Sequence, residues 1–576
     1  MPRTIPQGTG RAGQGLRTYG CFDFRGGLDV LTSPALMAVA NTPGSRNRLI
    51  EATNVVYHVD GSVGKRWGIK RSTGVISANT PILGGTEFIT SDGTHRTLFE
   101  TSDGKVWQYV ADAVEPISAA TIKSGLTNTQ YRPSYTSFQD TLFMANGVDA
   151  PQQYDGTTWS ALGGSSPAKA RAIAAHANRL FASAMDVPSR LYWCKLNNPT
   201  DWTGTDDAGY LDVNPSDGGN LLGLVPSNQE LALLKTQRPY RLQGIGPVSG
   251  YTVADSLTPA TGSIGVTNKT AAVYALNDVW YLSQMGLHRL SATDQFGDLA
   301  SGLVSDLIQP YFRPIWDVFT GGNYQPAHLE QGYLENVDAP QLVHDAGNDL
   351  LIFGQSRASD GVAYLTRLLV YDLRIRAWSE WNLQGSGDGF TCLWPGRAGT
   401  YRISDIKLGM INTSTPAVAV GSLKRYAEGD TQRSDFTLST VPGVGTSIGI
   451  ASSVSHISVL GAPGLRKCPR YLFLSFAPQD RAATVTVQVF YDRLFVDDFT
   501  SPDVHVTFDV HALSTESGIV KRIDLGGSTP GFPAGSPKHL CEYMTVRVWN
   551  ANADETFTLL GYEVMWSPRR FIRRAQ

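Results

Sequence analysis

The chain has 576 residues, of which 41% are hydrophobic and only 17% charged. This composition excludes a disordered protein, and the length exceeds one ordinary core, so two or three domains are expected. The formal net charge of −3 excludes a protein that coats DNA through bulk positive charge. With 59 glycines and 10% aromatic residues, the composition favours short strands joined by tight turns.

Residues 1–20 are rich in Gly, Arg and Thr without periodicity, which indicates an extended arm within an N-terminal region of residues 1–80. Residues 84–110 then alternate short β-prone runs with two Ser-Asp-Gly turns, at 91–93 and 102–104. Asp-Gly between alternating runs is typical of a hairpin with a type I′ turn, whose two central positions need positive φ. Residues 84–110 therefore predict a three-stranded meander.

Five later segments open alike, with polar residues followed by an apolar run. They are QDTLFMANG (139–147), NRLFASAMD (178–186), NQELALLKT (228–236), NDVWYLSQM (277–285) and NDLLIFGQS (348–356), and their starts lie 39, 50, 49 and 71 residues apart. A repeat of roughly 40–50 residues made of strands and turns is typical of a β-propeller. Residues 81–431 therefore predict a β-propeller of about six to seven blades, in which 408–428 is the doubtful unit.

Several repeats continue into a second strand that ends at or near Trp, for example LYWCKLNNPTDW (191–202). The run 176–202 gathers a His, a Cys, Asp, Arg, Lys and Trp residues, which are the residue types of a catalytic site. Its place in the repeat favours one blade, with the aromatic rings packed between sheets. The predicted blade-packing aromatics are Trp107, Trp159, Trp193, Trp202, Trp280 and Trp378.

The repeat stops after about residue 432, where longer alternating strands begin. Leu472, Leu474 and Phe476 fall on one face, and the valines of TVTVQV (484–489) do the same, as half-buried antiparallel strands require. Residues 432–576 therefore predict a β-sandwich. Helix is scarce, and SGLVSDLIQPYF (301–312) is the best candidate, ended by Pro310.

Five cysteines are scattered along the chain without any CxxC pair: Cys21, Cys194, Cys392, Cys468 and Cys541. An odd and dispersed set predicts free buried thiols made in a reducing compartment. No apolar run approaches the ~18 residues of a membrane helix, and the opening MPRTIPQGTGRAGQG lacks the apolar core of a signal peptide. We expect a chain made in the cytoplasm without membrane insertion.

Motifs for cofactors and metals are weak, and we predict neither. GTGRAG (8–13) matches the dinucleotide fingerprint GxGxxG, but no strand precedes it. His505 and His511 share a strand face, yet six residues of strand place them roughly 20 Å apart, too far to chelate one ion. YDGTTW (154–159) resembles the Asp-box of sialidase-type propellers but departs from it, because Asp155 directly precedes Gly156 where the box has a residue between them. Asp-boxes are in any case structural turns.

A propeller glycosidase needs two carboxylates about 5–10 Å apart. Asp206, Asp255 and Glu335 are candidates, but nothing in the sequence distinguishes them from turn residues. We therefore predict no catalytic residues and no enzyme.

The C-terminus WSPRRFIRRAQ is the clearest charge cluster, with Arg569, Arg570, Arg573 and Arg574 within six residues. Arginine suits bidentate contacts with phosphate or an acidic partner. The alternative is a solvated tail, and the sequence leaves both open.

Three stretches resemble the tail nozzle, or hub, proteins of short-tailed, podovirus-like bacteriophages. The first is residues 24–72, with Asn54-Val55, Asp60-Gly61-Ser62 and Lys65-Arg66-Trp67-Gly68. The second is NRLFASAMDVPSRLYWCKLNNPTDW (178–202), similar to the family's "NRLF…P..LYWS…P.DW" blade. The third is VYDLRIRAWSEW (370–381), similar to its "YD…W" blade end.

The resemblance implies a structural virion protein, a subunit of a ring beneath the portal and adaptor, for which sixfold symmetry is expected. Such a ring surrounds the channel through which double-stranded DNA leaves, retains the genome until ejection, and binds tail fibres or a needle. The implied location is the virion tail, after synthesis in the bacterial host cytoplasm. The 71-residue spacing departs from an even repeat and indicates an inserted loop near 311–336, a hypothetical gate or neighbour contact.

Two other readings from different classes stay open. One is a propeller-based adhesin that binds a receptor or glycan, and the other is an enzyme that cleaves cell-surface polysaccharide. A glycan array would reveal the first and turnover the second.

Overall fold

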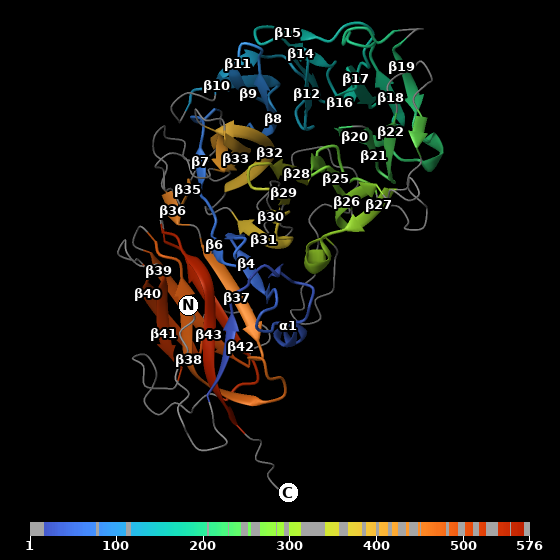
Figure 1. The fold of residues 1–576 in the computed structure, drawn as a ribbon. Coiled ribbons are helices and arrows are strands. Elements are labelled where there is room, and N and C mark those ends of the chain that lie inside the picture. Colours follow the sequence, from blue (N-terminus) through green and yellow to red (C-terminus); the bar gives the residue numbers. More distant parts are fainter. Residues whose placement is uncertain are drawn as a thin grey trace. The chain divides into compact units, whose positions relative to one another are not determined.

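The computed structural model describes residues 16–569 apart from several segments. The segments that lie outside the description are 77–79, 111–116, 204–206, 229, 244–251, 255–264, 284, 293–298, 313–339, 356–366, 383–387, 399–402, 413–416, 424–433, 437–446, 450, 480–482, 493–501, 511–517, 526–539 and 553–554. The motif GTGRAG and most of the expected inserted loop near 311–336 fall outside it. The fold is all-β (Figure 1). Across the described ranges, no helix is long and apolar enough to cross a membrane.

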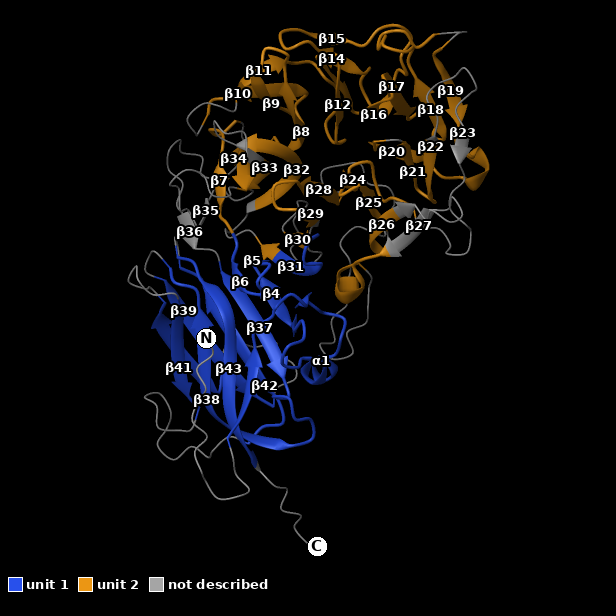
Figure 2. Cartoon of the chain, viewed as in Figure 1, with its two compact units in different colours: residues 1–66, 372–380, 449–576 blue, residues 67–371, 381–448 orange. Residues whose placement is uncertain are grey.

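The chain forms two compact units, shown in different colours in Figure 2. Unit 1 comprises Met1–Arg66, Asp372–Glu380 and Gly449–Gln576, and unit 2 comprises Trp67–Tyr371 and Trp381–Ile448. This division differs from the expected boundaries at residues 80 and 431. The physical reason is strand pairing, because strands near the start of the chain complete sheets whose other strands come from its end.

Unit 2 contains successive four-stranded antiparallel sheets, each built from strands consecutive in sequence. The first sheet comprises β8 (Ile82–Ile89), β9 (His95–Thr101), β10 (Lys105–Val110) and β11 (Ala120–Lys123), and the second comprises β12 (Ser134–Phe138), β13 (Thr141–Ala145), β14 (Gln152–Tyr154) and β15 (Trp159–Ala161). The third comprises β16 (Ala170–His176), β17 (Arg179–Ala184), β18 (Arg190–Trp193) and β19 (Gly209–Asp212), and the fourth comprises β20 (Leu221–Pro226), β21 (Leu231–Lys235), β22 (Pro239–Gln243) and β23 (Thr252–Ala254). The fifth comprises β24 (Ala272–Ala275), β25 (Asp278–Ser283), β26 (Gly286–Ala292) and β27 (Leu299–Leu303). The meander expected at 84–110 is confirmed as β8, β9 and β10.

Two further groups of strands complete unit 2. β28 (Gln341–Asp345), β29 (Leu350–Gln355) and β30 (Arg367–Asp372) follow one another in one sheet. β32 (Asp388–Ala398), β33 (Ile403–Asn412) and β34 (Ala417–Leu423) form another, and β7 (Ile69–Arg71) pairs antiparallel with β34. The earliest strand of unit 2, β7, thus completes the last four-stranded sheet of that unit. The short strands β35 (Ser434–Phe436) and β36 (Ser447–Gly449) pair with each other.

The first strands of these sheets contact one another in sequence order. β8 contacts β12, and the contacts continue through β16, β20, β24 and β28 to β32, which in turn contacts β8 (Figure 1). The succession of sheets therefore closes on itself, which is a propeller-like arrangement.

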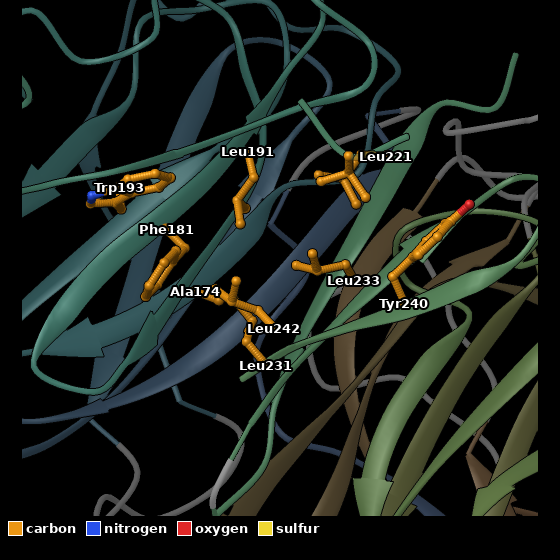
Figure 3. Packing of buried hydrophobic residues seen from close by; sticks show 10 residues of the cluster. Ala174, Phe181, Leu191, Trp193, Leu221, Leu231, Leu233, Tyr240 and Leu242 are labelled. Atoms are coloured by element: carbon orange, nitrogen blue, oxygen red, sulfur yellow. The ribbon is translucent and has the colours of Figure 1, made fainter. Parts of the chain in front are cut away.

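Adjacent sheets pack through buried apolar side chains. Between β16–β19 and β20–β23, Phe181, Leu191 and Trp193 face Leu233 and Tyr240 (Figure 3). Similar clusters join the first sheet to the second and the second to the third. Another joins the first sheet to the β32–β34 sheet. A single sheet of four short strands cannot bury both its faces, so its stability depends on its neighbours.

The polar residues that open each repeat form hairpin turns, and the apolar run that follows each turn is the second strand of its sheet. Positive φ angles occur in pairs at Gln139-Asp140, Ala177-Asn178 and Leu276-Asn277. Paired positive φ angles match the type I′ turn that suits the twist of a hairpin. The turns at 91–93 and 102–104 differ from the expectation, because only their glycines have positive φ.

Unit 1 contains two larger sheets. The β38 sheet has the order β41 (Ile519–Asp524), β38 (Arg466–Phe476), β43 (Thr558–Arg569), β6 (Val63–Lys65), β5 (Val55–Tyr57), with β1 (Arg17–Cys21) also paired to β43. The β37 sheet has the order β4 (Glu51–Thr53), β37 (Ser452–Ser458), β42 (Met544–Asn550), β39 (Thr484–Tyr491), β40 (Val504–Asp509), and β31 (Ala377–Asn382) pairs with β4 at Glu380. β2 (Gly27–Leu28) and β3 (Arg48–Leu49) form a small parallel pair.

The two sheets of unit 1 bury their facing sides. Leu472, Leu474 and Phe476 are fully buried, as the alternation predicts, and so are the valines of β39. Phe476 of the β38 sheet packs edge-on against Phe508 of the β37 sheet, with ring centroids 5.9 Å apart. His456 of β37 hydrogen-bonds the hydroxyl of Tyr562 on β43.

The best helix candidate from the sequence, residues 301–312, is helical only in its second half. Residues 301–312 form the end of β27 and a 3-10 helix, η3 (Asp306–Tyr311), which contains Pro310. The α-helix of the described residues is α1 (Pro34–Ala40), where Ser33 caps the N-terminus and Pro34 occupies the first turn. Proline and a serine cap are ordinary helix-start signals. A second 3-10 turn, η1, spans Pro215–Asp217.

All five cysteines are free and buried, which confirms this part of the prediction from their spacing. Burial raises the pKa of the Cys392 thiol to about 11. The Cys392 thiol therefore stays neutral at physiological pH and acts as a small apolar side chain.

We predict that Leu233→Ala destabilises the protein by about 2–5 kcal/mol, because it leaves a cavity between two sheets. Leu276→Ala is the matched control, since Leu276 is 57% exposed in a hairpin turn. It should change the unfolding free energy by less than about 0.5 kcal/mol. Urea unfolding of the two variants beside the wild type measures both effects. Equal effects of the two substitutions would contradict the packing described between these sheets.

Candidate functional site

The arginine cluster expected at the C-terminus falls mostly outside the described residues. Arg569 ends β43, where its backbone is opposite Arg466 of β38. Arg570, Arg573 and Arg574 lie outside the residues that the structure describes. The structure therefore places only the start of this cluster, at the end of a strand of unit 1.

Four of the six predicted tryptophans lie in or against clusters between sheets of unit 2. Trp193 and Trp202 are each 8% exposed and belong to the clusters on either side of the third sheet. Trp107 and Trp159 are partly buried against the clusters on either side of the first sheet. The indole N–H of Trp202 donates to the carbonyl of Pro199, which ties the end of the LYWCKLNNPTDW segment into a turn.

The other two tryptophans have different surroundings. Trp280 of β25 is 5% exposed and its ring lies 6.1 Å from that of Tyr371. Trp378 belongs to segment 372–380 of unit 1, where its carbonyl accepts a hydrogen bond from the hydroxyl of Tyr57 at 2.8 Å.

The candidate glycosidase carboxylates Asp206, Asp255 and Glu335 lie outside the described residues. Asp155 of the Asp-box-like motif caps its own turn. Its carboxylate accepts hydrogen bonds from the Thr157 hydroxyl and from the backbone N–H groups of Thr157 and Thr158. These three hydrogen bonds lower the pKa of Asp155 to about 2. Where the chain is described, no cluster of three His, Cys, Asp or Glu residues could hold a metal ion.

Sequence reasoning missed a buried carboxyl group at Glu100 of β9. Glu100 has no exposed surface, and its Oε1 accepts from the amides of Asn128 at 3.0 Å and Asn146 at 3.3 Å. Its Oε2 has no hydrogen-bond partner. Burial raises the pKa of Glu100 to about 7, against the lowering effect of the two amides.

The charges near Glu100 come from three parts of unit 2. Asp149, which binds the same Asn146 amide, raises the pKa of Glu100, and Lys269 lowers it. The hydroxyl of Tyr135 on β12 is buried, and Glu100 contributes to the raised pKa of that phenol. The ammonium of Lys269 donates to the carbonyl of Arg171 at 2.8 Å. This cluster links the first, second and third sheets with the segment before β24.

A second polar cluster joins the third and fourth sheets at Lys235. Its ammonium, fully buried, donates to the carbonyls of Val213 at 2.7 Å and Asn214 at 3.0 Å and to Asp217 at 2.5 Å. The hydroxyl of Tyr240 donates to the other carboxylate oxygen of Asp217 at 2.8 Å. All three protons of the ammonium are thus used, as a buried lysine requires.

A third cluster, Asp405, Lys407 and Ser422, has the residue types of an activated serine nucleophile. The ammonium of Lys407 lies 3.0 Å from the Ser422 hydroxyl and 3.1 Å from the Asp405 carboxylate. All three side chains are at most 4% exposed, so the hydroxyl offers no surface to a substrate. Burial raises the pKa of Asp405 in spite of the neighbouring ammonium. The cluster joins β33 to β34 and supports the closing sheet.

No protein-family model matches the chain, and no curated protein matches it in sequence. Solved structures similar in fold include the WD40 β-propeller domain of Doa1, with 8% identity, a TM-score of 0.37, and coverage of 62% of this chain and 98% of that one. YCF48 bound to D1 peptide has 10% identity, a TM-score of 0.37, and coverage of 63% and 97%. BamB from Moraxella catarrhalis has 10% identity, a TM-score of 0.34, and coverage of 65% and 94%.

We predict that Glu100→Gln removes a pH dependence of stability. The raised pKa means that the folded state holds the proton while the unfolded state releases it, so stability falls as pH rises from about 4.5 to about 7. The wild type should lose about 3 kcal/mol over this window relative to the variant. Urea midpoints from about pH 4 to pH 8 measure the difference.

Asp92→Asn is the control for this series. Asp92 is exposed, and its hydrogen bonds to Thr90 and Thr94 lower its pKa to about 2, so its contribution changes only below that window. Parallel profiles for wild type and Glu100→Gln would show that Glu100 is ionised in both states.

We predict that Lys235→Met destabilises the protein by about 3–5 kcal/mol, because it leaves Asp217 without its counter-charge. Lys105→Met is the matched control, since its pair with Asp103 is exposed and such pairs contribute about 0–1 kcal/mol. The double variant Lys235→Met with Asp217→Asn should recover part of the loss. Thermal unfolding of all three measures the series, and no recovery in the double variant would contradict a charge effect.

Proposed function

We propose that this chain is a subunit of a ring-shaped tail nozzle of a short-tailed bacteriophage. In this role it is structural: copies assemble below the portal and adaptor, enclose the channel for double-stranded DNA, and retain the genome until ejection. We further propose that unit 2 is a seven-bladed β-propeller closed by β7, and that the two sheets of unit 1 form a β-sandwich. The clustered arginines Arg569, Arg570, Arg573 and Arg574 are proposed contacts with a partner or with DNA.

The observation that carries the proposal is where the resembling stretches lie. Residues 24–72 run through unit 1 and into the closing strand β7, and they include the passage from unit 1 to unit 2 after Arg66. Residues 370–381 include both ends of the segment Asp372–Glu380, which unit 1 takes from the middle of the chain. An unrelated propeller would have no reason to share sequence where this chain passes from one unit to the other.

Two further features support a structural role. The described clusters of charged side chains at Glu100, Lys235 and Asp405 join strands or sheets. The near-neutral chain, with a net charge of −3, would let DNA slide past, since each phosphate neutralised by Lys or Arg adds salt-dependent binding.

Electron microscopy of phage particles made with this gene disrupted tests the proposal. We expect heads that packaged DNA and then lost it, because the channel below the adaptor is left open. Supplying the intact gene in trans is the control, and it should restore full heads.

Full heads with complete tails that fail to attach to cells would contradict the nozzle and identify a receptor-binding or glycan-binding adhesin. Full, attached particles that leave host polysaccharide uncut would instead indicate an enzyme of the tail. Each outcome can be distinguished from the expected one in the same particles.

A further inference from the structure

Exposed apolar side chains are concentrated on the smaller unit. Of fourteen large apolar side chains that are exposed among the described residues, nine lie in unit 1. They are Leu16, Phe22, Leu31, Leu36, Val39, Val59, Leu465, Val520 and Leu540. Large exposed apolar patches on a folded protein mark interaction surfaces. Six of these side chains fall on two surfaces.

The first surface is the α1 ridge, defined as Leu31, Leu36 and Val39. These side chains are 48%, 67% and 48% exposed. No charged residue occurs between Asp29 and Arg46, so the ridge is flanked by uncharged chain on both sides. A short helix that exposes aliphatic side chains without charges is suited to contact another apolar surface.

The α1 ridge is held rigidly. The carboxylate of Asp29 accepts the backbone N–H groups of Leu31 and Thr32 at 3.1 and 2.8 Å. At the other end of α1, the amide of Asn41 donates to the carbonyls of Arg48 and Ile457 at 3.0 and 2.9 Å. A surface that is already ordered loses little conformational entropy when it docks.

The second surface is the β38 face, the side of the β38 sheet that points away from the β37 sheet. Strand register places on it Thr18 and Gly20 of β1, Met565 and Glu563 of β43, Tyr471 and Phe473 of β38, and Arg522 and Val520 of β41. Leu16 and Phe22 flank β1 and are 51% and 47% exposed, and Val520 is 64% exposed. An antiparallel sheet with one solvated side ordinarily places polar residues there.

Aromatic rings occupy the middle of the β38 face. Tyr471 and Phe473 lie with their ring centroids 6.3 Å apart, and the guanidinium of Arg522 stacks 5.2 Å from the ring of Tyr471. Phe22 lies over the glycines Gly20 and Gly561, where a Cβ would come within 2.7 and 2.2 Å of its ring. The glycines therefore flatten the sheet surface beneath Phe22.

The two surfaces are on opposite exteriors of unit 1. Met37 and Ala38 of α1 pack on Ile457 of β37. Ile457 points away from the β38 sheet, because its neighbour His456 is the residue that contacts Tyr562 of that sheet. The α1 ridge and the β38 face of one copy therefore cannot meet each other.

We propose that the α1 ridge of one copy docks on the β38 face of the next copy. A contact between two different surfaces of identical subunits is heterologous, and repeating it gives a ring when the rotation between neighbouring copies closes. The ridge carries no charged side chain, so it brings no like charge against Arg522 and Glu563 of the face. Its aliphatic side chains meet Phe22, Val520 and the rings of Tyr471 and Phe473. This inference rests on the proposed ring and names the surfaces that form it.

Single charged substitutions in purified full-length chain test the interface. Leu36→Glu places a carboxylate on the ridge, and Val520→Glu places one on the face, and both positions are too exposed to disturb folding. Each should raise the concentration for half-assembly about a hundredfold, since a buried unpaired charge at an interface costs on that order. Sedimentation velocity measures assembly, and unchanged thermal midpoints verify the fold.

Mixing the two variants distinguishes this contact from a self-complementary one. The Val520→Glu chain keeps an intact ridge and the Leu36→Glu chain keeps an intact face, so the mixture should form a one-to-one dimer that cannot grow. Leu276→Glu is the control, because Leu276 is 57% exposed but lies in unit 2. It should assemble like the wild type.

Several results would overturn the inference. They are a wild-type chain that stays monomeric at tens of micromolar, single variants that still form rings, or a mixture that forms no dimer. The gene-disruption experiment is independent of all three, because it reports on DNA retention and not on which surfaces touch. Rings made by both single variants together with leaking particles would reject this interface while the nozzle role stands.

Discussion

The structure of unit 2 depends on one constraint, which is that a sheet of four short strands cannot bury its own two faces. Each sheet therefore needs an apolar neighbour on both sides, as Phe181, Trp193 and Leu233 show at one junction. A row of such sheets would leave two apolar faces exposed at its ends. Contact between β8 and β32 removes both ends at once, and the pairing of β7 with β34 completes the closing sheet.

Closure also explains where charged side chains are buried. Groups such as Glu100 and Lys235 lie where strands or sheets meet, and each is bound by amides, carbonyls or a carboxylate of a neighbouring segment. Burial without such partners would cost several kcal/mol, on the order of 1–3 kcal/mol for each unpaired polar group. These groups therefore restrict which segments can be neighbours, while the apolar clusters provide most of the attraction.

Unit 1 follows a different plan, because strands from both ends of the chain share its sheets. β1, β5 and β6 lie in the same sheet as β38 and β43, so its fold requires segments separated by most of the sequence. Its interior is filled by Leu472, Leu474 and their partners, yet its exterior carries apolar side chains as well. A unit with apolar interior and exterior is suited to assembly, which is the basis of the proposed contact between copies.

The sequence by itself determined the strand content, the repeated hairpins and the faces of the longer strands. The alternation of Leu472, Leu474 and Phe476, and the polar turn before each apolar run, are local patterns with periods of two residues or a few. Tertiary structure alone decided which strands are partners: β7 with β34, β1 with β43, and Glu100 with asparagines 28 and 46 residues away. The periodicity of a strand indicates which of its faces is buried, but not which segment covers that face. The expected boundaries at residues 80 and 431 therefore did not match the two units.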